Sequence, residues 1–117
     1  MADALLRPSV ACPRVFLCVE PVDFRKSIDG LSLLVEQALG LNPFESVLYV
    51  FVNKRRDKIK ILLWEKNGFV LWYKRLEKER FKWPKGHAGQ TLTLNGEELN
   101  WLLDGAPQAH KDITMDG

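Results

Sequence analysis

The chain has 117 residues, and its 17 Lys and Arg against 15 Asp and Glu give a net charge of +2. This length predicts one domain, and a hydrophobic content of 46% supplies a core and excludes disorder of the whole chain. Apolar runs stay short of the roughly 20 residues that span a membrane, and charged residues and a proline interrupt the first segment. We therefore expect a cytoplasmic protein with no membrane contact and no signal peptide, in which Cys12 and Cys18 are reduced thiols.

Positive charge is concentrated in one part of the chain. Residues 53–85 hold twelve Lys or Arg and four acidic residues, so this segment carries +8 and the remainder −6. A basic segment attracts polyanions, whereas an acidic one repels them or attracts basic proteins. The asymmetry therefore indicates the kind of partner rather than the fold.

A short strand and a helix are predicted first. Residues 14–19 (RVFLCV) are an apolar, β-branched run followed by a proline, which is typical of a buried strand. Apolar residues then recur every three or four positions from 24 to 39, which predicts a helix with one apolar face. We expect Asp23 to cap this helix, Arg25 to pair with Asp29, and Gly40 to end it.

Three further strands are predicted as an antiparallel meander. Residues 47–52 are apolar on both faces and indicate a central strand, and residues 58–64 and 69–76 are joined through Asn67-Gly68, a type I′ hairpin signal. This turn would place Trp64 opposite Leu71 and Lys60 opposite Arg75. One face then carries Lys60, Leu62, Trp64, Phe69, Leu71, Tyr73 and Arg75. We assign the other face to the core beneath the helix: Ile59, Ile61, Leu63, Val70, Trp72 and Leu76.

A capping box, Asn95 with Glu98, predicts a last short helix that buries Leu99, Leu102 and Leu103 and stops at Gly105. The predicted fold class is α+β: strand, helix, three-stranded antiparallel meander and helix, with the helices on one face of a mainly antiparallel sheet. We place this single domain at residues 14–105, between mobile tails at residues 1–13 and 106–117.

Several segments together resemble a known family. They are residues 21–31 (PVDFRKSIDGL), 48–51 (LYVF), 57–76 (DKIKILLWEKNGFVLWYKRL), 81–84 (FKWP) and 99–105 (LNWLLDG). Over residues 14–105, the chain resembles the small accessory protein, called TnpB or the second open-reading-frame product, of bacterial insertion sequences of family sixty-six. The resemblance implies a role in moving a DNA element beside a separate, larger transposase. It implies no catalytic residues.

The residues themselves also argue against an enzyme. Phosphoryl transfer to DNA needs carboxylates that converge on metal ions, whereas Asp23 is explained as a helix cap and Asp29 with Glu36 as a solvated helix face. His87 and His110 have no Cys, Asp or Ser motif beside them, and the sequence contains no Gly-rich phosphate-binding loop. We expect no catalytic residue, no cofactor and no metal.

The basic meander suggests nucleic-acid binding, because Lys and Arg neutralise phosphates. The predicted nucleic-acid contacts are Lys54, Arg55, Arg56, Lys58, Lys60, Lys74 and Arg75. Exposed aromatic residues add stacking on bases; the candidates are Trp64, Tyr73 and Trp83. The alternative, which we favour for Trp64, Trp72 and Tyr73, is that these rings fill the core.

Two functional hypotheses follow. In the first, the chain is a noncatalytic transposition accessory that binds insertion-sequence DNA, the transposase, or both. In the second, it is an assembly module that binds the transposase or other accessory proteins of the element without touching DNA. Arg25, Lys26 and Trp101 are the candidate partner contacts, and the oligomeric state is left open.

Overall fold

The computed structural model describes residues 14–86 and 90–104. The two predicted tails, Cys12, both histidines and Gly105 lie outside the described residues. Within them the elements follow the order strand, helix, four strands and helix. The predicted α+β class is confirmed.

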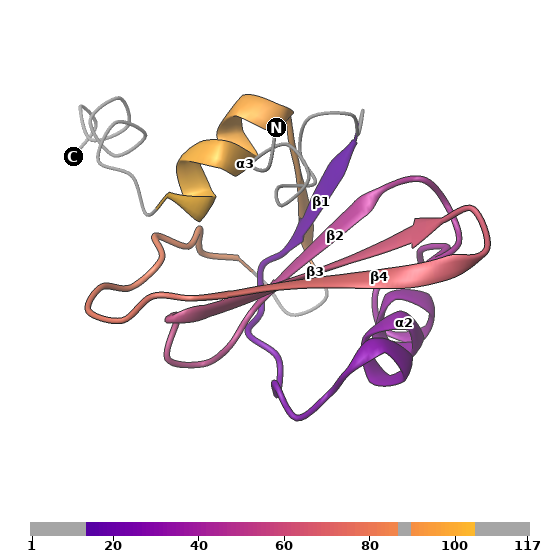
Figure 1. The fold of residues 1–117 in the computed structure, drawn as a ribbon, viewed down its shortest axis with the longest axis horizontal. Helices are drawn as coiled ribbons and strands as arrows, with labels where there is room; N and C mark the ends of the chain where they lie inside the picture. The colour runs from indigo at the N-terminus through magenta and orange to yellow at the C-terminus, as the bar shows by residue number, and fades with distance from the viewer. Residues whose placement is uncertain (1–13, 87–89, 105–117) are drawn as a thin grey trace.

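A five-stranded sheet forms the centre of the molecule (Figure 1). Its strands are β1 (Val15–Cys18), β2 (Leu48–Val52), β3 (Lys58–Glu65), β4 (Gly68–Arg75) and β5 (Thr91–Leu94), in the order β4-β3-β2-β1-β5. β1 and β2 run parallel, and the other neighbours are antiparallel. The prediction of a central strand at residues 47–52 is confirmed, because all five residues of β2 are buried. β5 was not predicted as a strand; it gains its hydrogen bonds by pairing with β1, far away in sequence.

The two helices, α2 (Ile28–Gln37) and α3 (Gly96–Leu103), cover opposite faces of the sheet (Figure 1). Leu31 and Val35 of α2 pack with Tyr49, Phe51 and Leu62. The other cluster combines α3 with the alternate strand residues: Leu99 and Leu103 with Leu48, Val50, Ile59 and Ile61. The prediction that both helices share one face was therefore wrong, as was the placing of the Ile59 and Ile61 face beneath the first helix.

Chain connection explains this arrangement. α2 links two parallel neighbours, β1 and β2, and such a crossover is almost always right-handed, which fixes the face on which its helix lies. α3 instead follows β5 on the far side of β1 and covers the face that α2 leaves open. Strand residues on both faces are consequently buried.

The first helix begins later than predicted. Its N-cap is Ser27, and the helix starts at Ile28 rather than Phe24. Asp23 instead accepts the backbone N–H of Arg25 at 2.9 Å, a local turn that competes with helix formation. Arg25 pairs with Asp23 and not with Asp29. α2 ends at Gln37 with Ala38 as its C-cap, two residues before the predicted end at Leu39. Gly40 does adopt the predicted left-handed conformation, with a φ of 67°.

The β3–β4 hairpin is shifted by two residues from the predicted pairing. Trp64 faces Phe69, and Lys60 faces Tyr73, so the turn residues are Lys66 and Asn67. Lys66 takes the left-handed φ of 55°. A shift of two preserves which side chains share a face, so the predicted faces survive. The observed register brings the Trp64 and Phe69 rings within 4.9 Å of each other, both against Phe44.

The last helix is as predicted at its start. The Asn95 side chain accepts the backbone N–H of Glu98 at 2.7 Å, and the Glu98 carboxylate accepts the backbone N–H of Asn95 at 2.8 Å. Leu99 and Leu103 are buried, and Leu102 packs half-buried against the same cluster. The capping box is therefore confirmed.

Candidate nucleic-acid interface

Asn53 organises the turn between β2 and β3. The residue is only 8% exposed, and its Nδ2 donates to Asp57 Oδ1 at 2.7 Å. Its Oδ1 accepts the backbone N–H groups of Asp57 at 3.1 Å and Lys58 at 2.9 Å. The hydrogen bond from Asn53 lowers the pKa of the Asp57 carboxyl. The turn is thus held from inside, while Lys54 and Arg55 are exposed.

The same turn is tied to the segment after β4. Arg56 has a left-handed φ of 62°, and its N–H donates to the Asn53 carbonyl at 3.0 Å. The Arg56 carbonyl accepts the N–H of Phe81 at 2.7 Å, and the Asp57 carbonyl accepts that of Leu76 at 2.8 Å. Because Phe81 is buried, the basic turn is anchored to the core.

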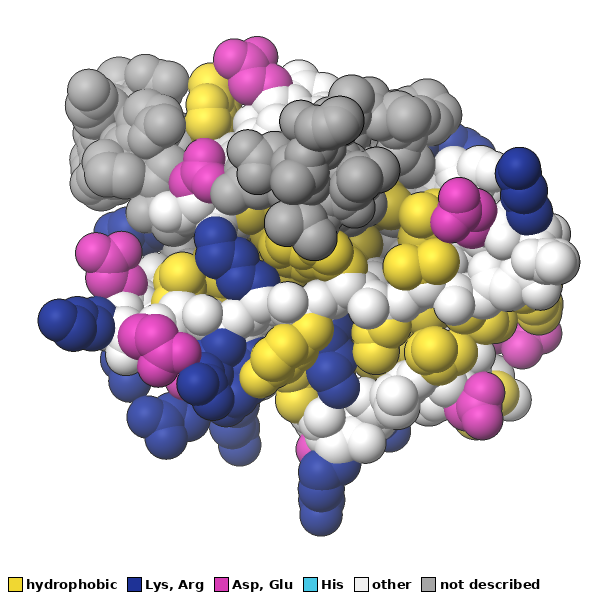
Figure 2. Space-filling view, in the orientation of Figure 1, with side chains coloured by type: hydrophobic (Ala, Val, Ile, Leu, Met, Phe, Trp, Pro, Cys, Tyr) yellow, Lys and Arg dark blue, Asp and Glu magenta, His cyan; other side chains and the backbone are white. Residues whose placement is uncertain are grey.

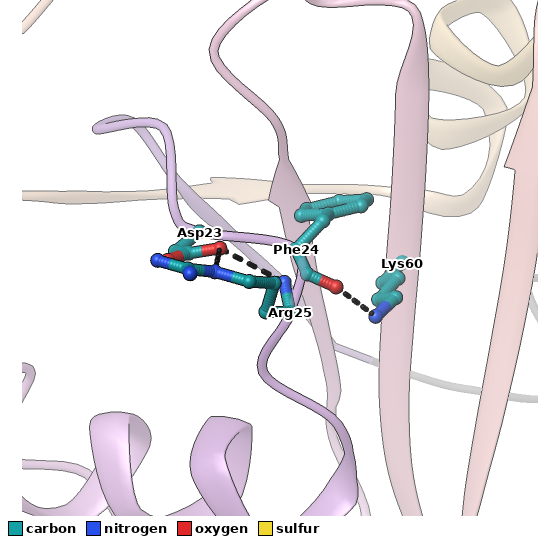
Figure 3. Close-up of polar contacts among 4 residues, drawn as sticks. All are labelled: Asp23, Phe24, Arg25 and Lys60. Carbon is teal, nitrogen blue, oxygen red and sulfur yellow. Dashed lines mark hydrogen bonds and ion pairs between the residues drawn. The ribbon is translucent and has the colours of Figure 1, made fainter.

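Residues 21–27 lie beside this turn and are clamped by Lys60. Nζ of Lys60 donates to the carbonyls of Phe24 at 2.9 Å and Lys26 at 2.8 Å, and it lies 4.9 Å from the centre of the Phe24 ring. Figure 3 shows this side chain reaching the segment from β3. Burial lowers the pKa of the Lys60 ammonium. Lys60 was predicted as a nucleic-acid contact, but its donors serve the fold.

The hydrogen bonds from Lys60 fix the backbone of Arg25, because Arg25 stands between Phe24 and Lys26, whose carbonyls accept them. Its guanidinium contacts Asp23, with Nη2 2.7 Å from Oδ2 and Nε 3.0 Å from the same oxygen (Figure 3). These hydrogen bonds lower the pKa of the Asp23 carboxyl to about 2, so the ion pair persists at neutral pH. The Arg25 side chain is nevertheless 91% exposed. It is positioned, yet available to a ligand.

These parts enclose an open groove of about 870 Å³, which we call the basic groove. Five Lys or Arg line it against one acid, together with apolar walls. The lining residues are Pro21, Val22, Asp23, Phe24, Arg25, Asn53, Lys54, Arg55, Lys58, Lys60 and Tyr73. Figure 2 shows Lys and Arg side chains gathered near the end of the sheet that carries the β2–β3 turn. The arrangement suits an anionic ligand, because the cations converge from two separate segments.

Not every predicted contact belongs to the groove. Arg56 is exposed but does not line it. Arg75 lies opposite Lys58 in the hairpin and forms an ion pair with Glu77 at 2.9 Å. Lys74 points to the other face, where its Nζ donates to the Leu103 carbonyl at the end of α3. The structure therefore divides the basic segment between two faces.

The predicted partner contacts also separate. Lys26 is exposed within the clamped segment, and its carbonyl accepts a hydrogen bond from Lys60. Trp101 is half-buried on α3, which covers the opposite face. Arg25 and Trp101 therefore do not form one surface.

Among the aromatic candidates, Tyr73 alone of the three lines the groove. Trp83 is buried and donates from Nε1 to the backbone of β1, and Trp64 packs half-buried at the other end of the hairpin. Trp72 also packs, half-buried, against the core beneath α3. Tyr73 was expected in the core, but 49% of the residue is exposed.

Asn53 and Pro21 are site residues that sequence reasoning missed. Asn53 ends an apolar run and stands four residues before Asp57, a spacing that permits a side-chain turn. The position of Pro21 had no such signal, because its contact with the groove depends on the pairing of Val22 N–H with the Val52 carbonyl at 2.9 Å.

We expect Lys60→Met to lower the free energy of unfolding by about 1.5–3 kcal/mol, because it removes a charged donor from two carbonyls. Lys58→Met is the matched control on the same strand. Nζ of Lys58 lies 3.9 Å from Asp57 Oδ1, so its loss is expected to cost less than about 1 kcal/mol. Urea denaturation followed by circular dichroism measures both, and equal losses would contradict the clamp.

Within residues 14–86 and 90–104, no three His, Cys, Asp or Glu side chains gather in a way that could hold a metal ion. Cys18 is a free, buried thiol, and burial raises its pKa. None of the helices in this part of the chain is long and apolar enough to cross a membrane.

Comparisons with known proteins agree with the resemblance seen in the motifs. The family model described as IS66 Orf2 like protein matches residues 13–112. Two proteins of Sinorhizobium fredii are similar to the chain. The uncharacterized protein y4jC is 35% identical over 92 residues, covering 79% of this chain and 78% of its own. The uncharacterized protein y4hO is 31% identical over 107 residues, covering 92% of each chain.

No solved structure matches the chain. The family match spans both walls of the basic groove as well as α3. The chain therefore belongs to the IS66 Orf2-like family, the transposition accessory proteins of IS66 insertion sequences.

Proposed function

We propose that the protein is a noncatalytic transposition accessory, in a domain of residues 14–105, that binds the phosphate backbone of insertion-sequence DNA in the basic groove. Family membership supports the role in transposition. The proposed contact with DNA is supported by the basic groove.

The observation that carries the proposal is the convergence of Arg25 with Lys54, Arg55 and Lys58 on one groove. The backbone that carries these residues is fixed in two places. Asn53 holds the β2–β3 turn, and Lys60 holds the facing segment that carries Arg25. A preformed set of cations pays less side-chain and loop entropy on binding than a flexible one. Phosphates are spaced along a DNA strand, so several of these side chains can neutralise phosphates together and release the counterions bound to the DNA.

A second candidate is docking of a protein, such as the transposase of the same element. The observation that favours it is Phe44, which is 54% exposed although its ring contacts Trp64 and Phe69. These rings lie at the hairpin-turn end of β3 and β4, whereas the basic groove lies at the other end. The two surfaces can therefore be tested separately.

The experiment is a fluorescence-anisotropy titration of the purified protein into a labelled element-end duplex and a scrambled duplex, at several salt concentrations. If the groove holds two to four phosphates, the logarithm of affinity falls against that of salt with a slope of about −2 to −4. Tighter binding of the element end would add sequence recognition to phosphate contact.

Absence of binding at low salt, both to these duplexes and to a labelled single strand of the same sequence, would exclude direct DNA contact and favour the protein-docking candidate. Binding that is insensitive to salt would also contradict the groove, since phosphate neutralisation requires counterion release.

A further inference from the structure

Tyr73 is the one exposed residue among the Tyr and Trp residues that the structure describes. Tyr49 is buried and its hydroxyl donates to the Asn42 carbonyl at 2.7 Å, and Trp83 is buried with its Nε1 bonded. Tyr73 is 49% exposed. Over residues 14–86 and 90–104, its ring contacts no other aromatic ring and its hydroxyl forms no hydrogen bond. About half of this residue is therefore exposed where it lines the basic groove.

The groove around this ring is not uniformly charged. Pro21, Val22 and Phe24, which belong to the clamped segment, form an apolar wall. Lys54 and Arg55 contribute charge from the β2–β3 turn. Such a combination matches a ligand that has both an anionic and a flat apolar part. The volume of the basic groove, about 870 Å³, falls in the range of pockets that hold small ligands or a few linked groups.

The outer surface of duplex DNA offers phosphates but hides the faces of its bases in the stack. A ligand of that kind would satisfy the cations and leave the ring of Tyr73 unused. An unpaired nucleotide presents a phosphate and an open base face together. Proteins that bind single strands combine a basic groove with aromatic side chains on which bases stack.

The sheet also leaves room beside Tyr73. β4 is an edge strand, with β3 as its one neighbour in the sheet. Tyr73 stands directly opposite Lys60, whose Nζ is directed to the Phe24 and Lys26 carbonyls rather than across the tyrosine. A base can therefore approach the ring from the open edge while its phosphate reaches the turn.

From these observations we propose that the basic groove takes single-stranded DNA, with one unpaired base stacked on Tyr73 and the adjoining phosphates on Arg25, Lys54, Arg55 and Lys58. This inference rests on the proposed function and narrows its ligand from DNA in general to an unpaired segment. The chemistry involves binding alone, with no covalent step.

The test compares Tyr73→Ala, Tyr73→Phe and Val70→Ala with the unmodified protein. Val70 is the matched control, because it is an exposed apolar residue of the same strand and does not line the groove. Each protein is titrated by anisotropy into a labelled 12-nucleotide single strand and into the duplex of the same sequence. Circular dichroism confirms that each variant is folded.

We expect Tyr73→Ala to weaken binding of the single strand about 5- to 150-fold, the value of one stacked base. Duplex binding should change by less than about twofold, and Tyr73→Phe and Val70→Ala should retain single-strand affinity, since the ring rather than the hydroxyl carries the stacking. That pattern would establish the ring as the base platform.

Two results would overturn the inference while leaving the proposed function intact: duplex bound as tightly as the single strand, or single-strand binding unaffected by Tyr73→Ala. A third result, no binding of either DNA by the unmodified protein at low salt, would reject the proposed function and the inference together.

Discussion

Trp83→Ala is expected to lower the free energy of unfolding by about 3–5 kcal/mol. Trp83 is 9% exposed and packs in the core cluster beneath α3. Its Nε1 donates to the carbonyls of Cys18 at 3.2 Å and Val19 at 3.1 Å. The side chain therefore fastens the segment after β4 to β1, two parts of the chain that are more than 60 residues apart. Its removal leaves a cavity and takes the shared donor away.

Two variants separate packing from hydrogen bonding. Trp83→Phe keeps much of the apolar volume and loses the donor, so we expect a smaller cost of about 1–3 kcal/mol. Tyr73→Ala removes an exposed ring and should change stability by less than about 0.5 kcal/mol. Urea denaturation is followed by circular dichroism, because loss of a Trp changes the fluorescence signal. A Trp83→Ala protein as stable as the original would show that residues 81–84 do not hold the sheet.

Removing the two exposed cations that the β2–β3 turn contributes to the groove should have the largest effect on binding. With Lys54→Ala and Arg55→Ala combined, we expect the slope of log affinity against log salt to become less negative by about 2, close to one unit for each lost phosphate contact. Affinity at low salt should fall at least about tenfold. Folding should be retained, because both side chains are exposed and the turn is held by Asn53.

The control for this pair is Lys78→Ala with Arg80→Ala. Both residues are exposed in the same basic segment, yet neither lines the groove. Each double variant loses two positive charges, so any general electrostatic attraction between protein and DNA weakens equally in both. If the two pairs reduce affinity and slope to the same extent, binding depends on overall charge and the groove has no special part.

Local signals identified most elements correctly, and the errors have physical causes. The Asn95 and Glu98 capping box acts within four residues and was read correctly. Asp23 had two local options, a helix cap or a turn with Arg25, and sequence spacing does not choose between them. The structure adopts the turn, because the clamp from Lys60, 34 residues from Lys26, holds that segment outside the helix.

The hairpin shows the difference between face and register. Alternation along residues 58–75 determines which side chains share a face, and any even shift preserves it. The exact pairing depended instead on the contact of Trp64 and Phe69 with Phe44, a residue on another part of the chain. A turn signal of two residues was too weak to override it.

The candidate site divides in the same way. Four of the seven predicted nucleic-acid contacts, Lys54, Arg55, Lys58 and Lys60, line the groove together with Arg25 from the predicted partner contacts. Lys74 was included because it belongs to the same basic run, although alternation alone places it on the face opposite Tyr73. The groove itself had no sequence signature. Its two walls, residues 21–25 and the β2–β3 turn, come together through a backbone hydrogen bond from Val22 to Val52 at the end of β2.

By itself, the sequence determined the α+β class, the buried central strand, the last helix and the position of the basic turn, because each depends on periodicity or on contacts a few residues apart. Its motifs also determined the family. Tertiary structure alone decided that the helices lie on opposite faces, that residues 91–94 join the sheet, and that Arg25 meets the basic turn. These outcomes require pairing across 30 or more residues, and the free energy of such contacts depends on the packing of the whole chain rather than on any local pattern.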